Sequence, residues 1–402
     1  MTPAHTTGEP AELVCSNSLK SLALHTAHGV LKKELEILSS PLIAAAKASA
    51  VPAGTALAVD RARFSAAVLE KITASESIKL IRREIPEPEP GYAATIIAAG
   101  PLVSEPLAAW LGRAFSATGL HFYDAIAPIV SADSIDRSIA FFASRDDRGG
   151  ADDYLNCPFT EEQYRLFYEA LRKADGLEAR AFEEARFFEA CLPVEVMAER
   201  GEMALAFGPL KPIGLVDPAT GKRPFAVCQL RRENAAGTCY NLVGFQTRLR
   251  QREQERVFRM IPGLQQADFL RFGSIHRNTY LESPILLNQD LSFKNDPTLF
   301  CAGQLCGSEG YTESIATGHL AGLFANVRIK NEPFNPPPRE SAIGSLLHHV
   351  TAPREGPFTP TNIHFGLFPP IELQGKRIKK RVNRDLLCRR AVESVTGWAT
   401  AQ

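Results

Sequence analysis

The pattern of hydrophobic and polar positions in residues 60–100 predicts a helix, a turn and a strand. Apolar residues recur at helical spacing through DRARFSAAVLEKI (residues 60–72), and the acidic, proline-broken segment PEPEPGY (residues 86–92) ends that pattern. The apolar run ATIIAAG (residues 94–100) is typical of a strand that is buried on both faces in a parallel sheet. Together these elements indicate an α/β core.

The middle of the chain has a different pattern. In residues 161–174, EEQYRLFYEALRKA, the aromatic and aliphatic side chains fall on one face of a helix, and residues 178–191 continue with mixed charged and aromatic positions. Between residues 208 and 245, Gly, Pro and Asn interrupt short β-prone runs, which predicts an antiparallel sheet. This change of pattern predicts an inserted α+β domain.

Residues 299–318, LFCAGQLCGSEGYTESIATG, predict a short strand, a glycine-rich turn and a helix that begins near Tyr311. Glycines let a cofactor approach the backbone, and the N–H groups at a helix start attract phosphate or an electron-rich ring edge. An ordinary strand–turn–helix connection would also need glycines, so this pattern alone leaves both interpretations open. The strand at residues 94–100 favours the cofactor interpretation, because a doubly wound nucleotide-binding sheet can be assembled from both ends of a chain.

Composition narrows the class of protein. The 402 residues are enough for two or three domains, and 45 Lys plus Arg balance 45 Asp plus Glu, so any contact with nucleic acid must be local. Eight cysteines without short regular spacing indicate neither a disulfide framework nor a zinc site. We find no secretory signal and no apolar run of membrane-spanning length. We therefore expect a cytoplasmic protein with no membrane segment and no metal site.

Two of the cysteines differ from the others, most of which fit packing positions. Cys15 lies in the polar segment VCSNSLKS, where the following residues can begin a helix, and a helix start makes a thiol more reactive. Cys191 ends a helical stretch just before Pro193, which would present its thiol at a surface. The cysteines that we expect to serve packing are Cys228, Cys239, Cys301 and Cys388.

Idiosyncratic sequence blocks run through nearly the whole chain. In order they read VCSNSLKS, VPAGTALAVDR, YDAIAPIV, YLNCP, CLPVEVMAERG, GPLKPIGL, KRPFAVCQLR, NAAGTCYNLVGFQTRL, HRNTYLESP and GQLCGSEGYTES. With these blocks the chain resembles the folate- and flavin-dependent tRNA uracil-5 methyltransferases. The resemblance implies an FAD-binding, Rossmann-like domain of the glutathione-reductase type, formed by residues 1–112 and 290–402, with an insertion domain at residues 113–289 on the tRNA side.

The resemblance also implies the reaction. Methylenetetrahydrofolate would supply a one-carbon unit to carbon 5 of the T-loop uridine of tRNA, reduced FAD would convert it to methyl, and NADPH or NADH would reduce the flavin again. Cys191 matches the family's nucleophilic cysteine, and Cys15 matches its second reactive cysteine, with either a shielding or a proton-handling role. The implied cofactor contacts are Gly303, Gln304, Gly307, Glu309, Gly310 and Tyr311, with Asn17, Ser18, Gly100, Arg277 and Asn278.

Two basic segments are candidates for the tRNA contact. Residues 222–259 contain nine Lys or Arg against three Glu, and a second basic run lies at residues 376–381. Charge runs are often only solvated faces, so we consider the first segment the better candidate. The arginines expected to contact RNA are Arg248, Arg250, Arg252, Arg256 and Arg259.

The sequence departs from the family pattern at its start. Family members begin with a βαβ unit that bears Gly-x-Gly-x-x-Gly and holds the FAD pyrophosphate, and this unit is missing here. We expect either that Met1 is an internal methionine of a full-length enzyme or that the chain is a truncated RNA-binding remnant, and the first interpretation is favoured because both reactive cysteines remain. For the polypeptide as it stands, weak or no flavin colour is expected. A relative that acts on ribosomal RNA would use the same chemistry, whereas the wobble-uridine-modifying flavoproteins lack the paired cysteines.

Overall fold

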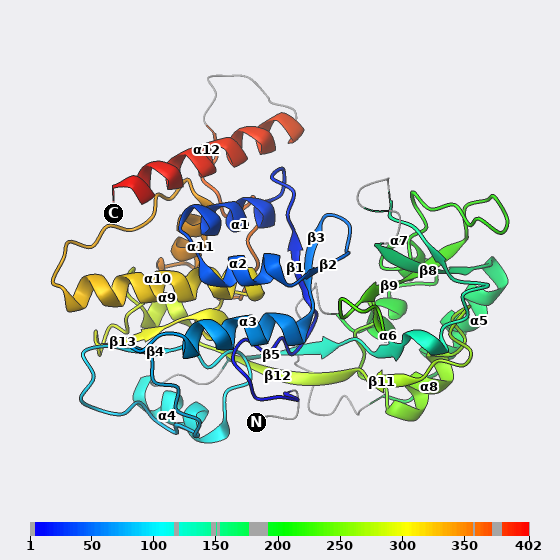
Figure 1. The fold of residues 1–402 in the computed structure, drawn as a ribbon, viewed down its shortest axis with the longest axis horizontal. Helices are drawn as coiled ribbons and strands as arrows, with labels where there is room; N and C mark the ends of the chain where they lie inside the picture. Colours follow the sequence, from blue (N-terminus) through cyan, green and yellow to red (C-terminus); the bar gives the residue numbers. More distant parts are fainter. Residues whose placement is uncertain are drawn as a thin grey trace.

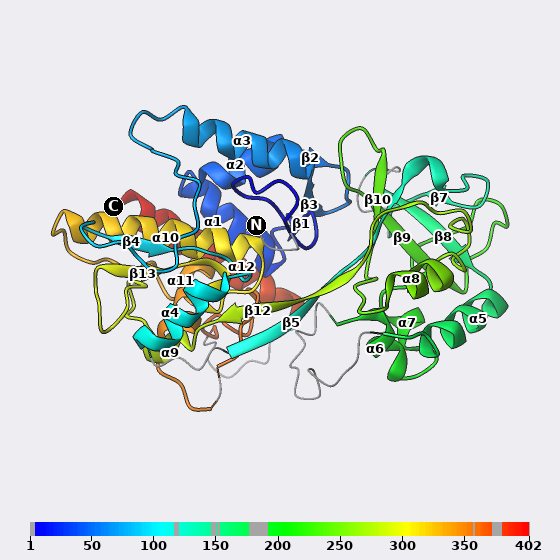
Figure 2. The same cartoon turned by 90° about the horizontal axis from the view of Figure 1, so that it is seen from below.

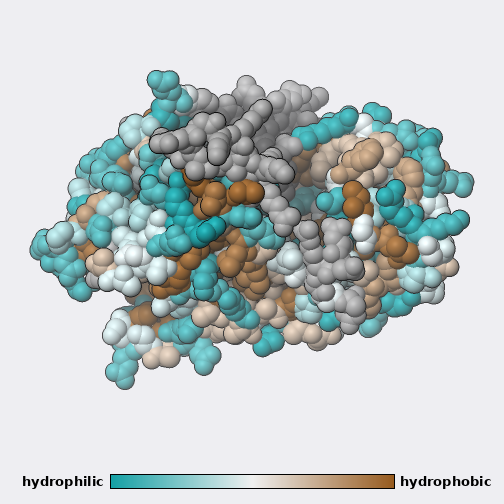
Figure 3. Space-filling view, turned by 90° about the horizontal axis from the view of Figure 1, so that it is seen from above, coloured by the Kyte–Doolittle hydropathy of each residue, from teal (hydrophilic) through white to brown (hydrophobic). Residues whose placement is uncertain are grey.

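The computed structural model describes residues 5–115, 120–145, 150, 153–176, 192–356, 358–371 and 380–401. They form two units joined by a long antiparallel ribbon (Figure 1). The first unit holds both ends of the chain, and the second holds its middle (Figure 2). On the face seen from the side of the C-terminal helix, hydrophobic patches lie between hydrophilic areas on both units (Figure 3).

The first unit contains most of the helices. Its antiparallel sheet has the order β1-β3-β2, and a separate parallel pair joins β4 to β13. The strands are β1 (Ser18–Ser21), β2 (Ala50–Val51), β3 (Ala56–Val59), β4 (Thr95–Ile97) and β13 (Leu299–Cys301). The helices are α1 (Ala27–Ile37), α2 (Pro41–Ala48), α3 (Arg61–Thr73), α4 (Glu105–Phe115), α9 (Ser283–Leu286), the 3-10 turn η5 (Gly303–Cys306), α10 (Tyr311–Ile329), α11 (Ala342–Thr351) and α12 (Lys380–Thr400).

The second unit is built on one antiparallel sheet of order β11-β6-β10-β9-β8-β7. The antiparallel pairing of β9 with β10 confirms the prediction for residues 208–245. The strands are β6 (Ile129–Ser131), β7 (Phe141–Phe142), β8 (Tyr154–Phe159), β9 (Ala226–Arg232), β10 (Cys239–Leu242) and β11 (Phe269–Arg271). The helices are η1 (Ala132–Ser134), α5 (Glu161–Arg172), α6 (Val194–Glu199), α7 (Ala204–Phe207) and α8 (Gln251–Phe258).

The ribbon between the units consists of β5 (Leu120–Ile126) and β12 (Ser274–Tyr280). The two strands pair without interruption from Ser274 opposite Ile126 to Tyr280 opposite Leu120. In both ribbon views it runs from the first unit to the second (Figures 1 and 2). The chain therefore passes between the two units through the two paired strands of this ribbon.

Local sequence explains the helices that the pattern predicted. The Asp60 side chain accepts a hydrogen bond of 3.1 Å from the Arg63 amide and so caps α3, which buries Phe64 and Val68. Helix α5 begins with a reciprocal capping box between Thr160 and Gln163, and its aromatic face is buried. Both predicted helices are confirmed. The continuation predicted for residues 178–191 lies outside the described residues.

The parallel pair β4–β13 confirms the parallel strand, but one detail was wrong. Ile96 is 38% exposed, so β4 is not buried on both faces. The reason is that β4 and β13 pair only with each other among the described strands, and the remaining described strands pair antiparallel. The carboxyl ends of this pair nevertheless lie together, because Ala302 N donates to Ile97 O at 3.0 Å.

Hydrophobic side chains form one large cluster in each unit. The first cluster combines residues 13–115 with residues 280–398, and the second lies within residues 127–267. Each unit thus packs around its own core. The division at about residues 113 and 289 into a cofactor domain and an insertion domain stays a prediction.

Candidate functional site

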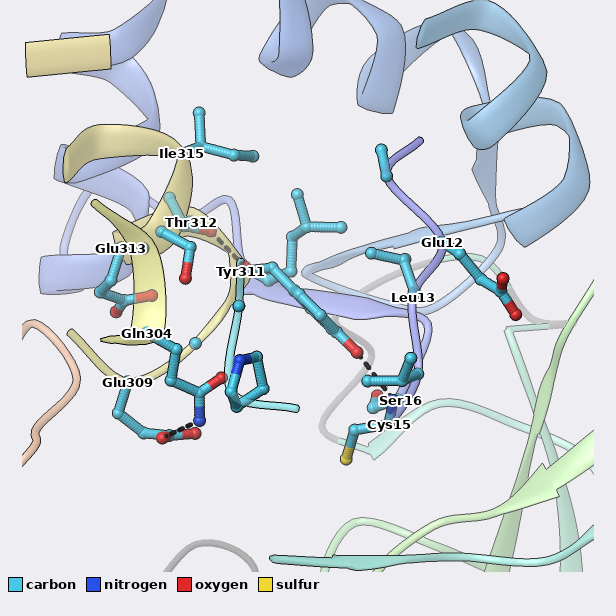
Figure 4. Close-up of a pocket in the computed structure, with 18 of the residues that line it drawn as sticks. Glu12, Leu13, Cys15, Ser16, Gln304, Glu309, Tyr311, Thr312, Glu313 and Ile315 are labelled. Atoms are coloured by element: carbon cyan, nitrogen blue, oxygen red, sulfur yellow. Dashed lines mark hydrogen bonds between the residues drawn. The ribbon is translucent and has the colours of Figure 1, made fainter. Parts of the chain in front are cut away.

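A cavity of about 630 Å³ lies in the first unit beside the second. Its walls come from the N-terminal loop, the end of β4, and the turn between β13 and α10 (Figure 4). Nine of the residues expected at the site line it: Cys15, Ser18, Gly100, Asn278, Gly303, Gln304, Glu309, Gly310 and Tyr311. Apolar side chains, among them Leu13, Leu19 and Ile126, line it too, which suits a flat ring.

The glycine-rich turn forms one wall. Gly303 and Gly310 have φ values of 74° and 107°, which L side chains rarely adopt, and both line the cavity. Gln304 Nε2 donates to Glu309 Oε2 at 2.6 Å, and the two side chains lie side by side in the wall (Figure 4). The predicted strand, turn and helix start at Tyr311 are confirmed.

Gly307 belongs to the turn but not to the cavity wall. Its φ is 83°, and a Cβ there would lie 2.3 Å from the ring of Phe358. The glycine is therefore needed for packing against that ring. The structure gives no support to Gly307 as a direct cofactor contact.

The N-terminal turn of α10 lines the cavity, with Tyr311, Thr312, Glu313 and Ser314 in its wall. Thr312 Oγ1 donates to Leu19 O at 3.1 Å, which ties the helix start to β1. Glu313 is buried; burial raises its pKa, but the hydrogen bond from His28 and the charge of Lys20 outweigh burial, so the pKa lies below its usual value. The positive helix end and the cation of Lys20, which also lines the cavity, favour an electron-rich ligand edge.

The opposite wall supplies a polar atom without a partner. Asn278 is 2% exposed, lines the cavity, and its Nδ2 makes no hydrogen bond within the described residues. A buried amide donor without a partner is costly, and a ligand acceptor would satisfy it. The neighbouring Arg277 lies in β12, but its side chain is outside the described part. Gly100, with φ 69° and open space where a Cβ would be, leaves room at the end of β4.

Cys15 lies at the cavity on an ordered loop. Its amide donates to Tyr311 Oη at 2.9 Å (Figure 4). Arg61 Nη2 donates to its carbonyl at 2.7 Å. The expected helix after Cys15 is wrong. The chain instead enters β1, because Ser18 pairs with Ala58 of β3.

Asn17 supports this loop from behind. It is fully buried, and its Nδ2 donates to Val59 O at 3.0 Å and to Arg232 O at 2.9 Å. Its Oδ1 accepts from Arg231 Nε at 2.8 Å. These contacts occupy the side chain, which is not among the residues that line the cavity, so Asn17 supports the loop from behind and its cofactor contact stays a prediction.

Cys191 lies outside the described residues, but the chain just after it is visible. Val194 N donates to Gln246 O at 2.7 Å, and Gln246 lines the cavity. Glu195, in the first turn of α6, accepts from Thr247 Oγ1 at 2.9 Å and from Arg248 N at 2.8 Å. The start of α6 is thus fixed to a segment that reaches the cavity.

The remaining described cysteines fit packing. Cys228 and Cys301 are fully buried and Cys388 is 8% exposed, whereas Cys239 is only partly buried. Burial raises the pKa of Cys157 to about 12. Thiols of this kind stay protonated at neutral pH and are poor nucleophiles.

The arginines expected to contact RNA lie on and around α8. Arg250, Arg252, Arg256 and Arg259 are exposed. Arg248 differs, since it is 20% exposed and lies 3.7 Å from Glu195 and 3.8 Å from Glu199. The second basic run at residues 376–381 lies outside the described residues, apart from the backbone of Lys380 and Arg381 in α12.

Sequence reasoning missed several residues of the cavity wall. Lys20, Gln246 and Glu313 line it, as does Glu12, whose carboxylate accepts hydrogen bonds from Thr6, Thr7 and Gly8. The family-like blocks contained Lys20, Gln246 and Glu313, but nothing in the sequence distinguished them from their neighbours.

The described part of the chain offers neither a membrane-spanning helix nor a cluster of metal-binding side chains. Its helices include none with the length and apolar character needed to cross a membrane. The described His, Cys, Asp and Glu side chains form no group of three or more that would hold a metal ion.

Comparison with known proteins identifies the family. The sequence model of the family described as "Glucose inhibited division protein A" matches residues 1–333. The chain is 52% identical over 98% of its length to the methylenetetrahydrofolate--tRNA-(uracil-5-)-methyltransferase TrmFO of Heliobacterium modesticaldum, of which it covers 89%. It is 50% identical over 98% of its length to the protein of the same name from Geobacter sulfurreducens, of which it covers 90%.

Solved structures agree on the fold. A structure of GidA from Aquifex aeolicus matches with a TM-score of 0.69 at 17% identity, over 96% of this chain and 66% of that one. A second crystal form of the same protein gives a TM-score of 0.66 at 16% identity. At this identity the likeness shows the fold alone. From the sequence relatives, the chain belongs to the family of the methylenetetrahydrofolate--tRNA-(uracil-5-)-methyltransferases.

Proposed function

We propose that this chain transfers a one-carbon unit from methylenetetrahydrofolate to carbon 5 of a uridine in tRNA and reduces it to a methyl group with electrons from FAD. The observation that carries the proposal is that Cys15, the glycine-rich turn and the start of α10 line one cavity in a chain about 50% identical to enzymes named for this activity. Within tRNA, we take the T-loop uridine as the target.

The cavity fits the ring end of a flavin. Three features support this fit: the positive end of α10, the unpartnered Nδ2 of Asn278, and Gly310, where an added Cβ would lie 2.7 Å from Glu313 Oε2. When bound, reduced FAD supplies the hydride that turns the transferred carbon into methyl. Gly303, Gln304, Glu309, Gly310 and Tyr311 would hold it on one side, and Gly100, Ser18 and Asn278 on the others.

The thiols of Cys191 and Cys15 act on the uracil ring and on the one-carbon adduct. A thiolate at Cys191 adds to carbon 6 of uracil and leaves carbon 5 as an enolate carbon, which attacks the electrophilic methylene carbon. The proton is then lost from carbon 5 as the methylene–nitrogen bond breaks and releases tetrahydrofolate, which leaves an exocyclic methylene on carbon 5. Addition of a hydride to that methylene forms the methyl group and an enolate, and breakage of the S–C6 bond restores the ring and frees the thiolate. Cys15, whose backbone is held against Tyr311, shields the one-carbon adduct or accepts that proton.

Substrate and reductant complete the proposal. The exposed arginines of α8 (Arg250, Arg252, Arg256 and Arg259) would contact tRNA phosphates, with Arg248 in a supporting place. NADPH or NADH would reduce the flavin between turnovers. With these substrates, we expect the enzyme to act in the cytoplasm.

An assay with the purified chain tests the function. Unmodified tRNA, methylenetetrahydrofolate, FAD and NADPH or NADH are supplied, and 5-methyluridine is measured by mass spectrometry of the digested RNA. We expect methylation of the T-loop uridine, loss of methylation in C191A, and unchanged FAD binding in that variant. Methylation of ribosomal RNA but not tRNA, or full activity of C191A, would refute the corresponding part of the proposal.

A further inference from the structure

Three arginines converge on the loop Leu13–Asn17, which carries Cys15 and is called the cysteine loop below. Arg61 of α3 donates to the carbonyl oxygens of Leu13 and, at 2.7 Å, Cys15. Arg271 of β11 donates from Nη2 to Val14 O at 2.9 Å. Arg231 of β9 donates to Ser16 Oγ at 2.9 Å and to Asn17 Oδ1 at 2.8 Å. Each residue from Leu13 to Asn17 thus accepts a hydrogen bond from one of the three.

These arginines come from both units. Arg61 belongs to the first unit, whereas Arg231 and Arg271 belong to the sheet of the second. Asn17 adds a bond in the other direction, because its Nδ2 donates to Arg232 O. The cysteine loop is therefore fixed to the second unit as firmly as to its own.

Burial of these charged side chains costs free energy. Arg231 is 7% exposed, and the nearest compensating carboxylate, Glu233, is 4% exposed and lies 2.6 Å from Arg61 Nε. Desolvating several cations around a single carboxylate costs free energy that an apolar seam would not. Such a cost is tolerated where a defined geometry matters more than stability.

We propose that Arg231 and Arg271 are positioning residues for Cys15: they hold its loop in register with the second unit, which carries α8 and the described segment that follows Cys191 in the sequence. The inference rests on the proposed function. Because the uracil ring must meet groups from both units in one reaction, a loop fixed to both removes a degree of freedom from the reactive geometry.

The test separates the two halves of the reaction. In R271Q and R231Q, methyl transfer to tRNA should fall by about tenfold or more, since each loses a charge-assisted hydrogen bond to the loop. Reduction of bound flavin by NADPH, which does not need the cysteine, should stay within about twofold of the unmodified chain. R271K keeps the charge and one donor and should recover part of the methyl transfer.

A second readout follows Cys15 itself. Alkylation by a neutral maleimide, quantified on the Cys15 peptide by mass spectrometry, should become faster in R271Q, while alkylation of Cys239 should not change. The matched control is R390Q, because Arg390 also donates to backbone carbonyls, those of Pro369 and Pro370, but far from the loop in sequence. R390Q should change neither readout.

The results of these experiments distinguish a positioning role of the arginines from a purely structural role. A parallel fall of flavin reduction, methyl transfer and melting temperature in R271Q and R271K would show a merely structural role and overturn the proposal, as would unchanged methyl transfer in both. If the unmodified chain itself fails to methylate tRNA, the proposed function is refuted. The Cys15 alkylation rates would then still report whether the arginines hold the loop.

Discussion

The amide of Cys15 donates a hydrogen bond of 2.9 Å to the phenolic oxygen of Tyr311, a residue 296 positions further along the chain. This bond joins the cysteine loop directly to the first residue of α10. A side chain that lies in the wall of the cavity thus also orients a reactive cysteine. A change in the cavity wall at Tyr311 should therefore also change how Cys15 is held.

Replacement of Tyr311 with Phe tests this link. The variant keeps the ring but loses the acceptor for the Cys15 amide, so methyl transfer should fall by roughly threefold to tenfold, as expected for the loss of one partly buried hydrogen bond. The melting temperature and FAD affinity should change little. Tyr92→Phe is the matched control, because Tyr92 is 62% exposed. Equal activity of both variants would show that the bond is dispensable.

Gly310 should be intolerant of a side chain. In Gly310→Ala the new Cβ meets Glu313 Oε2 at 2.7 Å and the residue must keep a φ of 107°. We expect the dissociation constant for FAD, measured by quenching of flavin fluorescence, to rise by about tenfold or more, because backbone strain and crowding both affect the helix start. Gly322→Ala, in the same helix with open space around its Cα, should bind FAD normally. Normal binding by Gly310→Ala would remove this turn from the cofactor site.

We expect Asn278 to contribute to FAD binding and not to the stability of the folded chain. In Asn278→Leu an unpartnered buried donor is removed, so the free energy of unfolding without FAD should stay equal or rise, while FAD affinity falls. Asn156→Leu is the contrasting control, since Asn156 Nδ2 donates to Phe141 O, Ala143 O and Tyr154 O. The free energy of unfolding of that variant should be lower by about 1–3 kcal/mol, as expected when buried carbonyl groups lose their hydrogen-bond donor. Lower stability of apo Asn278→Leu would contradict the assignment.

The structure of the N-terminal loop, residues 6–12, should be lost at low pH. Burial raises the pKa of Glu12, but hydrogen bonds from Thr6, Thr7 and Gly8 outweigh burial and lower it to about 2. The carboxylate's contribution is therefore complete above the unfolded pKa near 4.5 and is lost as the pH falls toward 2. The hydrogen-exchange protection of residues 6–12, corrected for the intrinsic exchange rate at each pH, should fall over this range in the unmodified chain and already be low at pH 6 in E12Q. Equal protection in both proteins at pH 6 would refute the prediction.

A second carboxylate, that of the fully buried Glu34, has the opposite pH dependence. Burial raises the pKa of Glu34 to about 8, against two backbone hydrogen bonds from Ala342 and Ile343 that lower it. The folded state therefore binds the proton more tightly than the unfolded state, and the free energy of unfolding should fall as pH rises from about 5 to 8. Denaturant melts of Glu34→Gln should lack this slope. A slope that survives in the variant would assign it to other groups.

Local pattern was enough for the elements whose causes are local. Helices α3 and α5 have their caps and apolar faces within one segment, and β13 with the start of α10 could be recognised from the glycines between them. These predictions needed no knowledge of distant residues.

The predictions that failed depend on distant partners. The segment after Cys15 has helix-start residues, yet it forms β1 because β3 lies beside it, forty residues later in the chain. The packing of Gly307 against Phe358 also depends on a distant residue, and the role of Gly307 as a cofactor contact stays a prediction. The roles of Arg231 and Arg271 at the cysteine loop could not be inferred either, because a hydrogen bond to the side chains or backbone of a segment more than 200 residues away has no sequence signature.

The β5–β12 ribbon limits how this enzyme can change in evolution. Asn278 stands opposite Phe122 in an unbroken register, and side chains alternate between the two faces of a ribbon. Deleting one residue from either strand alone would shift that register and bring the neighbour of Asn278 to the cavity in its place. Changes in the length of this connection should therefore occur as matched pairs, two residues in each strand, and alignments of family members with longer or shorter ribbons should show gaps in both strands together.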